Sequence, residues 1–223
     1  MKHWLRLNFV LVCLAMLSTQ SANALRFEFD DEAEIADWEL GPQGTATVKD
    51  GMLELNVAGG QNCGIYFGEE NWTDYTLEAR VRKKEGDPYF HLFVRTQEPT
   101  VDFYFMEISY NSNTTSVFMF KGGVATEITG GPRPARPDSK DNKGGDAYTL
   151  AFEVQGDMLR TFIDGKLMVE TQDKTYQSGR PGLGSRDSTV WYEYVEINGP
   201  GIAPSPVESV GKLAVLWGTL KTR

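Results

Sequence analysis

Alternate carboxylates open the segment RFEFDDEAE, close to the start of the predicted mature chain. Glu28, Asp30 and Glu32 would share one face of a continuous strand, because side chains alternate between the two faces of a strand. Two carboxyl groups held about 5 Å apart are the acid and the nucleophile of a retaining glycosidase. The competing interpretation is structural, with Phe27 and Phe29 facing a core and the acids facing water. The structural interpretation is favoured, because Glu32 falls in a predicted loop and need not share the face of Glu28.

A second group of polar side chains falls on three predicted strands, YTLEARVR, YFHLFVRT and FYFMEISY. Alternation places these polar residues on the face opposite the better core residues. If the strands are neighbours, a polar patch forms on a concave sheet from Arg80, His91, Arg95 and Glu107. Such a patch suits a sugar, because charged groups bond to hydroxyls and an aromatic ring covers the C–H side of the sugar. The rings expected to do this are Trp72, Tyr104, Tyr110 and Trp191.

The same patch has a second interpretation. Opposite charges on neighbouring strands are ordinary, so these residues can equally form a charge ladder that solubilises one sheet. His91 is the only histidine in the predicted mature chain, and a metal site usually needs more such ligands. We therefore expect a binding role for this group and predict no catalytic residue.

The elements that must position these residues are short antiparallel strands. Through most of the chain, apolar and polar residues alternate with a period of two, and turn residues separate the runs. Asp50-Gly51 and Asp164-Gly165 each lie between two such runs, and Asp-Gly supplies the positive φ that a tight hairpin turn needs. About eleven strands are expected in this region, which is typical of an all-β, two-sheet antiparallel jelly-roll sandwich. One long insertion, residues 130–146, is expected to be a surface loop.

The chain divides into four predicted parts. Residues 1–24 have the basic start, short apolar run and A-x-A cleavage site of a signal peptide. The sandwich occupies residues 25–199, and a linker rich in proline and glycine follows at 200–206. Apolar residues recur at spacings of three and four in residues 207–223, which predicts a short C-terminal amphipathic helix. This tail either docks on its own domain or binds an extracellular protein.

Composition limits the class of partner. The net charge is −9, and an acidic chain should repel nucleic acid and anionic membrane surfaces. Beyond the signal peptide, no apolar run is long enough to form a transmembrane segment. Removal of the signal leaves Cys63 as the only cysteine, which excludes an internal disulfide. We expect a secreted protein, extracellular or periplasmic, with a single folded domain.

The order of the segments carries a family likeness. Residues 27–198 contain, in order, DGML, DYTLEARV, FHLFVRT, YFMEIS, LRTFIDGKLMVE, GRPGLGS and VWYEYVEING. This order resembles the concanavalin A-like superfamily of lectins and glucanases, and within it the laminin-G-like modules and the 3-keto-disaccharide hydrolase domains. The resemblance implies a sandwich that holds a glycan on its concave sheet. Two signatures of the hydrolase domains, an N-S-G turn and a histidine near the closing glycine motif, are replaced here by GDP before YFHLF and by SRD after GLG.

The resemblance also implies a cation. In sandwich modules of this kind a structural Ca²⁺ often joins the N-terminal loop to the last strand. Asp30, Asp31 and Glu193 supply oxygen ligands at about those places, and oxygen is the ligand that Ca²⁺ prefers. Calcium is therefore a candidate cofactor, and the alternative is that this acidic turn near the terminus is only solvated.

Three functions remain open from the sequence. A secreted, lectin-like module that binds a polysaccharide or glycan is preferred. The first alternative is a glycoside hydrolase that pairs Glu107 with Glu78 or Glu153. The second is a laminin-G-like adhesion module that binds a protein through its tail.

Overall fold

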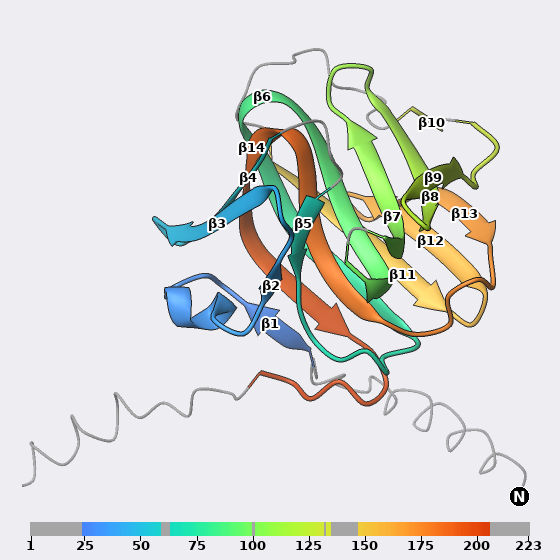
Figure 1. Ribbon diagram of the computed structural model, residues 1–223, viewed down its shortest axis with the longest axis horizontal. Helices are drawn as coiled ribbons and strands as arrows, with labels where there is room; N and C mark the ends of the chain where they lie inside the picture. The colour runs from blue at the N-terminus through green and yellow to red at the C-terminus, as the bar shows by residue number, and fades with distance from the viewer. Residues whose placement is uncertain (1–23, 59–62, 100, 132, 135–146, 206–223) are drawn as a thin grey trace, which may run out of the picture.

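The computed structural model shows a chain built almost entirely of antiparallel strands, with one short 3₁₀ helix (Figure 1). The structure describes residues 24–58, 63–99, 101–131, 133–134 and 147–205. The predicted signal peptide before Ala24, the tail 207–223 and most of the predicted loop at 130–146 lie outside the described residues and stay predictions. None of the helical structure in the described residues has the length and apolar character needed to cross a membrane.

Fourteen strands and one helix are described. The strands of the first half are β1 (Leu25–Phe27), β2 (Glu39–Leu40), β3 (Gly44–Lys49), β4 (Met52–Val57), β5 (Cys63–Tyr66), β6 (Tyr75–Glu98) and β7 (Asp102–Ser109). Those of the second half are β8 (Thr114–Lys121), β9 (Val124–Glu127), β10 (Arg133–Pro134), β11 (Ala147–Gln155), β12 (Met158–Ile163), β13 (Lys166–Gln172) and β14 (Arg180–Asn198). The helix, η1 (Glu32–Ile35), lies between β1 and β2.

β6 and β14 form the centre of the fold. They are the two longest strands, they pair with each other along most of their length, and each belongs to two layers of one continuous, curled sheet (Figure 1). Layer 1 runs through β3, β4, the second half of β14, the first half of β6, β11, β12 and β13, with β1 also beside β14. Layer 2 runs through β2, β5, the first half of β14, the second half of β6, β7 and β8, with β9 and β10 beside β8. The predicted all-β sandwich is confirmed.

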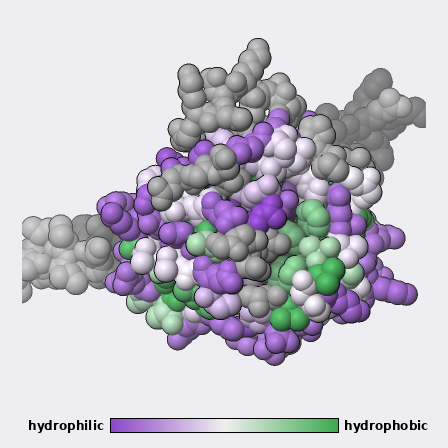
Figure 2. Space-filling model, turned by 45° about the horizontal axis from the view of Figure 1, so that its top comes forward, coloured by the Kyte–Doolittle hydropathy of each residue, from purple (hydrophilic) through white to green (hydrophobic). Residues whose placement is uncertain are grey.

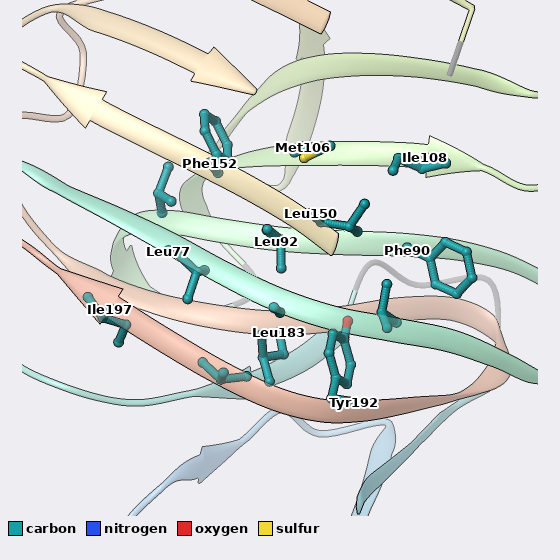
Figure 3. Packing of buried hydrophobic residues seen from close by; sticks show 14 of the residues in the cluster. Leu77, Phe90, Leu92, Met106, Ile108, Leu150, Phe152, Leu183, Tyr192 and Ile197 are labelled. Atoms are coloured by element: carbon teal, nitrogen blue, oxygen red, sulfur yellow. The ribbon is translucent and has the colours of Figure 1, made fainter. Parts of the chain in front are cut away.

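One hydrophobic core lies between the two layers. In β6 the core residues are odd-numbered from Tyr75 to Val81 and even-numbered from Phe90 to Val94. This change requires an irregular step between the two halves of the strand, and the pairing with β14 shifts there. Figure 3 shows side chains meeting in this core, with Leu77, Phe152 and Ile197 from layer 1 and Leu92, Met106 and Leu183 from layer 2. Because both layers share this core, their other faces lie on opposite outer sides of the molecule.

Both predicted hairpin turns are confirmed. Asp50 and Gly51 have φ values of 54° and 71° between β3 and β4. Asp164 and Gly165 have φ values of 49° and 75° between β12 and β13. Positive φ at both central residues is the conformation that matches the twist of a two-residue hairpin.

The residues that follow β14 lie against the start of the domain. The backbone N–H of Ser205 donates to the carbonyl of Ala24 at 3.0 Å, and its hydroxyl donates to the carbonyl of Arg26 at 2.8 Å. Ile202 is buried in the core. The two ends of the described domain therefore meet beside β1.

Candidate functional site

The outer face of layer 2 carries a compact group of polar residues. His91 of β6 and Glu107 of β7 pair directly across the two strands, and Nε2 of the histidine lies 3.2 Å from Oε2 of the glutamate. Arg186 of β14 approaches the same oxygen with Nη2 at 4.0 Å. Its guanidinium lies over the ring of Tyr89, with Cζ 3.7 Å from the ring centroid. These four residues are called the polar site below.

The four residues differ in exposure. His91 is fully buried, and its Nδ1 has no hydrogen-bond partner among the described residues. The side chains of Glu107 and Arg186 are 16% and 28% exposed, and Tyr89 is half-buried. A molecule that reaches this face can therefore contact the carboxylate, the guanidinium and the tyrosine, while His91 holds the carboxylate from the buried side.

A β-bulge in β14 positions Arg186. Asp187 has a φ of 50°, and the pairing with β6 shifts between Arg186 and Ser188. Aspartate is one of the few residues that tolerate this left-handed conformation. The hydroxyl of Ser188 donates to the carbonyl of Arg186 at 3.1 Å and lies 2.5 Å from the hydroxyl of Ser185. These bonds fix the irregular backbone from which the guanidinium extends over Tyr89.

Aromatic rings continue the same face away from the polar site. Phe105 and Phe118 stack with their centroids 4.9 Å apart and their planes 14° from parallel. Phe103 and Phe120 stack in the same way, 4.8 Å apart and 16° from parallel. The imidazole of His91 meets Phe105 edge to face at 5.3 Å, so the rings begin at the polar site. The cluster is called the aromatic row below and consists of Tyr66, Phe93, Phe103, Phe105, Phe118 and Phe120.

Two glycines allow the rings to lie against the strands. A Cβ atom added to Gly182 would lie 2.6 Å from Cδ1 of Tyr66, and one added to Gly64 would lie 2.6 Å from Cε2 of Phe93. Real Cβ atoms are essentially never found this close to a neighbouring atom. The two rings therefore occupy the space that side chains at these positions would fill.

The charge of Glu107 follows from its contacts. Burial by itself raises the pKa of this carboxyl group, but the hydrogen bond from His91 and the nearby charges of His91 and Arg186 outweigh burial and lower the pKa below its ordinary value of 4.5. Glu107 is therefore a carboxylate at neutral pH and only accepts hydrogen bonds.

This shift predicts a pH dependence of stability. A carboxyl group whose pKa is lower in the folded than in the unfolded protein stabilises the fold above its unfolded pKa, and that contribution is lost as the pH falls through its folded pKa. We expect the wild type to lose stability relative to Glu107→Gln as the pH is lowered from neutrality through the range below 4.5. Urea unfolding of both proteins across this range measures the difference. A stability difference that does not change with pH would contradict the assigned charge.

Arg95 does not belong to the polar site, and the prediction that it faces outward is wrong. Its side chain is fully buried. A φ of 51° at Arg95 interrupts the alternation of β6 and turns the side chain away from the face of His91. Nε and Nη2 donate to the carbonyl of Thr73 at 3.0 and 2.9 Å, and Nη1 donates to the carbonyl of Tyr176 at 3.0 Å. Because backbone carbonyls occupy these donors, Arg95 is a structural residue.

Two of the predicted sugar-stacking rings are interior. Tyr104 and Tyr110 are buried in the core between the layers, because β7 presents these side chains to its inner face. The hydroxyl of Tyr104 donates to Asp173 and accepts from the backbone N–H of Tyr176. Burial and the bond to Asp173 raise the pKa of Tyr104 to about 12. The prediction that these two rings bind a ligand is therefore wrong.

The two predicted tryptophans are engaged elsewhere. The ring of Trp72 lies across Gly68, where an added Cβ would be 2.6 Å from Cη2 of the ring. Trp191 lies on the outer face of layer 1, where its Nε1 donates to Glu54 at 2.9 Å and the amine of Lys84 lies 5.5 Å from its ring centroid. The structure brings neither ring into the polar site.

Arg80 lies on the opposite side of the molecule from His91. Its Nε donates to Glu193 at 3.1 Å on the outer face of layer 1, and Arg82 binds the same carboxylate. Further ion pairs on layer 1 join Lys84 to Glu54, Arg160 to Glu153 and Glu170, and Arg26 to Glu196. These ion pairs are called the charge ladder below. The sequence offered a ladder as the alternative for the four-residue patch, and of its members only Arg80 lies in this one. Of the predicted four-residue patch, the structure brings together only His91 and Glu107.

The acid pairs considered for a hydrolase do not form. Glu78 and Glu153 belong to neighbouring strands of layer 1, β6 and β11, and lie on its outer face. Glu107 lies on the outer face of layer 2, so the core of the sandwich separates it from both. This arrangement excludes a two-carboxylate mechanism that pairs Glu107 with Glu78 or with Glu153.

The acids of the first segment do not share a face either. β1 ends before Phe29, which has a φ of 59° and is buried in the core. Glu28 pairs with Arg26 at 2.6 Å, and the carboxylate of Asp31 caps η1. The structure thus supports the structural interpretation of this segment.

The predicted calcium ligands are not brought together. Glu193 binds Arg80 and Arg82, Asp31 caps η1, and Asp30 is exposed. In the part of the chain that the structure describes, no group of three or more His, Cys, Asp or Glu residues is suited to a metal ion. Calcium binding stays a prediction.

Known proteins share this fold. The family described as the 3-keto-alpha-glucoside-1,2-lyase-like domain matches residues 28–198, which include almost all of both layers. The protein belongs to this family. Membership in the lyase-like domain family confirms the resemblance that the order of the segments predicted.

Several relatives of this lyase-like domain have names that refer to carbohydrates. An extracellular exo-alpha-L-arabinofuranosidase from Streptomyces chartreusis is 23% identical over 148 residues, which are 66% of this chain and 17% of that protein. A levanase from Bacillus subtilis (strain 168) is 23% identical over 125 residues, which are 55% of this chain. The chain spans 17% of the length of each of these curated relatives. Among solved structures, carbohydrate-binding module CBM66 from Bacillus subtilis has a TM-score of 0.62 at 20% identity, covers 73% of this chain and shows the same fold over 95% of its own length.

Two residues of the polar site were not predicted. Tyr89 could have been found, because it shares the alternation of His91 along YFHLF. Arg186 appeared in the sequence only as the centre of SRD, the segment that follows GLG. No sequence signal indicated that a bulge would bring its guanidinium over Tyr89.

Proposed function

We propose that this lyase-like domain protein binds a carbohydrate on the outer face of layer 2, and that it does so outside the cytoplasm, as the predicted signal peptide indicates. The observation that carries the proposal is the polar site, where a partly exposed carboxylate and guanidinium lie beside an aromatic ring on one sheet face. The names of its relatives support the same ligand class, since they describe a carbohydrate-binding module, an arabinofuranosidase and a levanase.

Each exposed group has its own part in binding. Glu107 accepts hydrogen bonds from sugar hydroxyls. Arg186 donates hydrogen bonds from its guanidinium, which is 28% exposed beside Glu107. Tyr89 fixes the guanidinium by stacking and offers ring surface to the C–H groups of the sugar. His91 is a positioning residue that holds the carboxylate of Glu107.

Substitutions in the polar site test the proposal. A glycan array probed with the full chain identifies the sugar, and titration calorimetry with that sugar measures affinity. We expect Glu107→Gln and Arg186→Met each to weaken binding at least roughly tenfold, because hydrogen bonds to charged groups contribute about 1.5–3 kcal/mol. Glu170→Gln in the charge ladder is the matched control and should bind like the wild type. Unchanged affinity in both polar-site variants contradicts the proposal, and repeating the array with a chelator tests the calcium prediction.

A second candidate is a sugar-cleaving enzyme, the activity that the family description and both curated names suggest. The observation that favours it is the contact between buried His91 and partly exposed Glu107, because a paired imidazole and carboxylate are a common arrangement for proton transfer. Chromatographic analysis of products from bound glycosides separates the two candidates. Binding without product supports a binding module, whereas product release that is lost in His91→Gln while binding persists supports an enzyme.

A further inference from the structure

We infer that the partly exposed part of the aromatic row, Phe118 and Phe120, is a second subsite, which takes an apolar aglycone attached to the sugar held by the polar site. The inference rests on the proposed function, because the polar site must bind the sugar of the same ligand. The observation behind it is the direct juxtaposition of the two groups on one sheet face.

Strand pairing sets the direction and length of the second subsite. Residues paired across β6, β7 and β8 form successive rows on this face. The first row is His91, Glu107 and Ser116, the second is Phe93, Phe105 and Phe118, and the third is Phe103 and Phe120. Each step of two residues along a strand covers about 6.6 Å, so the last rings lie about 13 Å from Glu107. This span suits one sugar ring and one further group of similar size.

The chemistry of the row selects an apolar group. Its members on β7 and β8 are phenylalanines, which offer no hydroxyl or indole N–H to a second sugar. Within the row, Phe118 and Phe120 are half-buried and offer ring surface to a ligand, whereas the other four rings are buried. On the face shown in Figure 2, hydrophilic residues cover much of the surface and hydrophobic residues gather on one side. The large apolar side chains exposed in the described residues are Leu40, Val124 and Leu167. A stacked apolar surface that adjoins a polar site marks a place of binding.

Neighbouring residues limit the size of an apolar group over Phe118. The strand beyond β8 is β9, where Glu127 pairs with Phe118 and Ala125 pairs with Phe120, and both are exposed. The polar site borders the other side of the row through His91. An aryl ring or a short alkyl chain over Phe118 fits between His91 and Glu127.

Matched glycosides test the inference with the full chain. Methyl and phenyl glycosides of glucose, galactose, arabinose and fructose are titrated calorimetrically, with both anomers of each. We expect the phenyl form of the recognised sugar to bind about tenfold more tightly, since contact with aromatic rings adds roughly one order of magnitude in affinity. Phe118→Ala and Phe120→Ala should remove this preference and leave the methyl glycoside unaffected. Leu167→Ala, an exposed apolar residue on β13, is the control and should keep the preference.

The outcomes separate this inference from the proposed function. If the wild type binds methyl and phenyl glycosides equally, the inference is overturned. It is also overturned if the preference for the phenyl glycoside survives in both Phe118→Ala and Phe120→Ala. If only longer oligosaccharides bind, the row takes further sugars, so the inference fails and the proposed function stands. If no sugar binds in either experiment, the proposed function itself fails.

Discussion

Replacing Arg95 with leucine is expected to lower the free energy of unfolding by about 3 kcal/mol. The substitution keeps an apolar stem but removes the donors that serve the carbonyls of Thr73 and Tyr176. The arginine is fully buried, and so is its bond to the carbonyl of Tyr176, whereas its bonds to the carbonyl of Thr73 are partly buried. An unsatisfied buried acceptor costs about 1–3 kcal/mol, and losing the bonds to Thr73 as well puts the expected loss at the upper end of this range. Urea unfolding of the wild type and of Arg95→Leu measures it.

Arg80→Leu is the matched control for this prediction. Arg80 carries the same charge on the same strand, but its side chain is 38% exposed in the charge ladder. Exposed ion pairs contribute less than about 1 kcal/mol, so the control should unfold almost like the wild type. Folded Arg95→Leu should keep its affinity for any sugar that the wild type binds, because Arg95 is not part of the polar site. Similar stability losses in the two variants would show that the buried guanidinium contributes no more than a surface ion pair.

Replacing Gly64 with alanine is expected to destabilise the protein by roughly 2–3 kcal/mol, the upper part of the usual range for overpacking a filled interior. The added methyl group would collide with the carbonyl oxygen of Leu183 on the paired strand and would lie 2.6 Å from the ring of Phe93. Backbone atoms cannot rotate away as a flexible side chain can, so β5 and β14 must separate locally. Thermal and urea unfolding of Gly64→Ala measure the loss.

Gly51→Ala provides the comparison, because it adds the same methyl group at a position without close neighbours. No atom lies within 4 Å of a Cβ added at Gly51, although its φ of 71° strains an alanine. That strain costs about 1–2 kcal/mol. If Gly64→Ala proves no more destabilising than Gly51→Ala, the close packing of Phe93 against β5 is not a significant constraint.

The fold could be predicted from the sequence because its signals are local. The two Asp-Gly turns determine the hairpins around them, and the alternation of apolar residues in YFHLFVRT separates the core face from the outer face. The same alternation placed His91 and Glu107 on one face, which the structure confirms. These features depend on neighbouring residues and on the two-residue period of a strand.

The rest of the site could not be predicted because it depends on irregular backbone. A left-handed conformation at Arg95 turned a predicted surface residue inward. A change of face within β6 put Arg80 on the opposite side from His91. A bulge at Asp187 brought Arg186 over Tyr89. Aspartate is a residue type that tolerates the left-handed conformation of Asp187, whereas arginine is not expected in the left-handed conformation of Arg95. Of the three irregularities, only the bulge at Asp187 therefore has even a weak signal in the sequence.

The pairing of β6 with β14 also determines how this domain must fold. Thr96 pairs with Arg180 and Thr76 pairs with Asn198, so partners about a hundred residues apart must meet before either layer is complete, which places the protein among slow-folding topologies. Because both strands cross from one layer to the other, neither layer is an independent folding unit. During synthesis one edge of β6 stays unpaired until the final described strand emerges. The polar site needs Arg186 from that strand, so it cannot be complete before β14 has paired with β6.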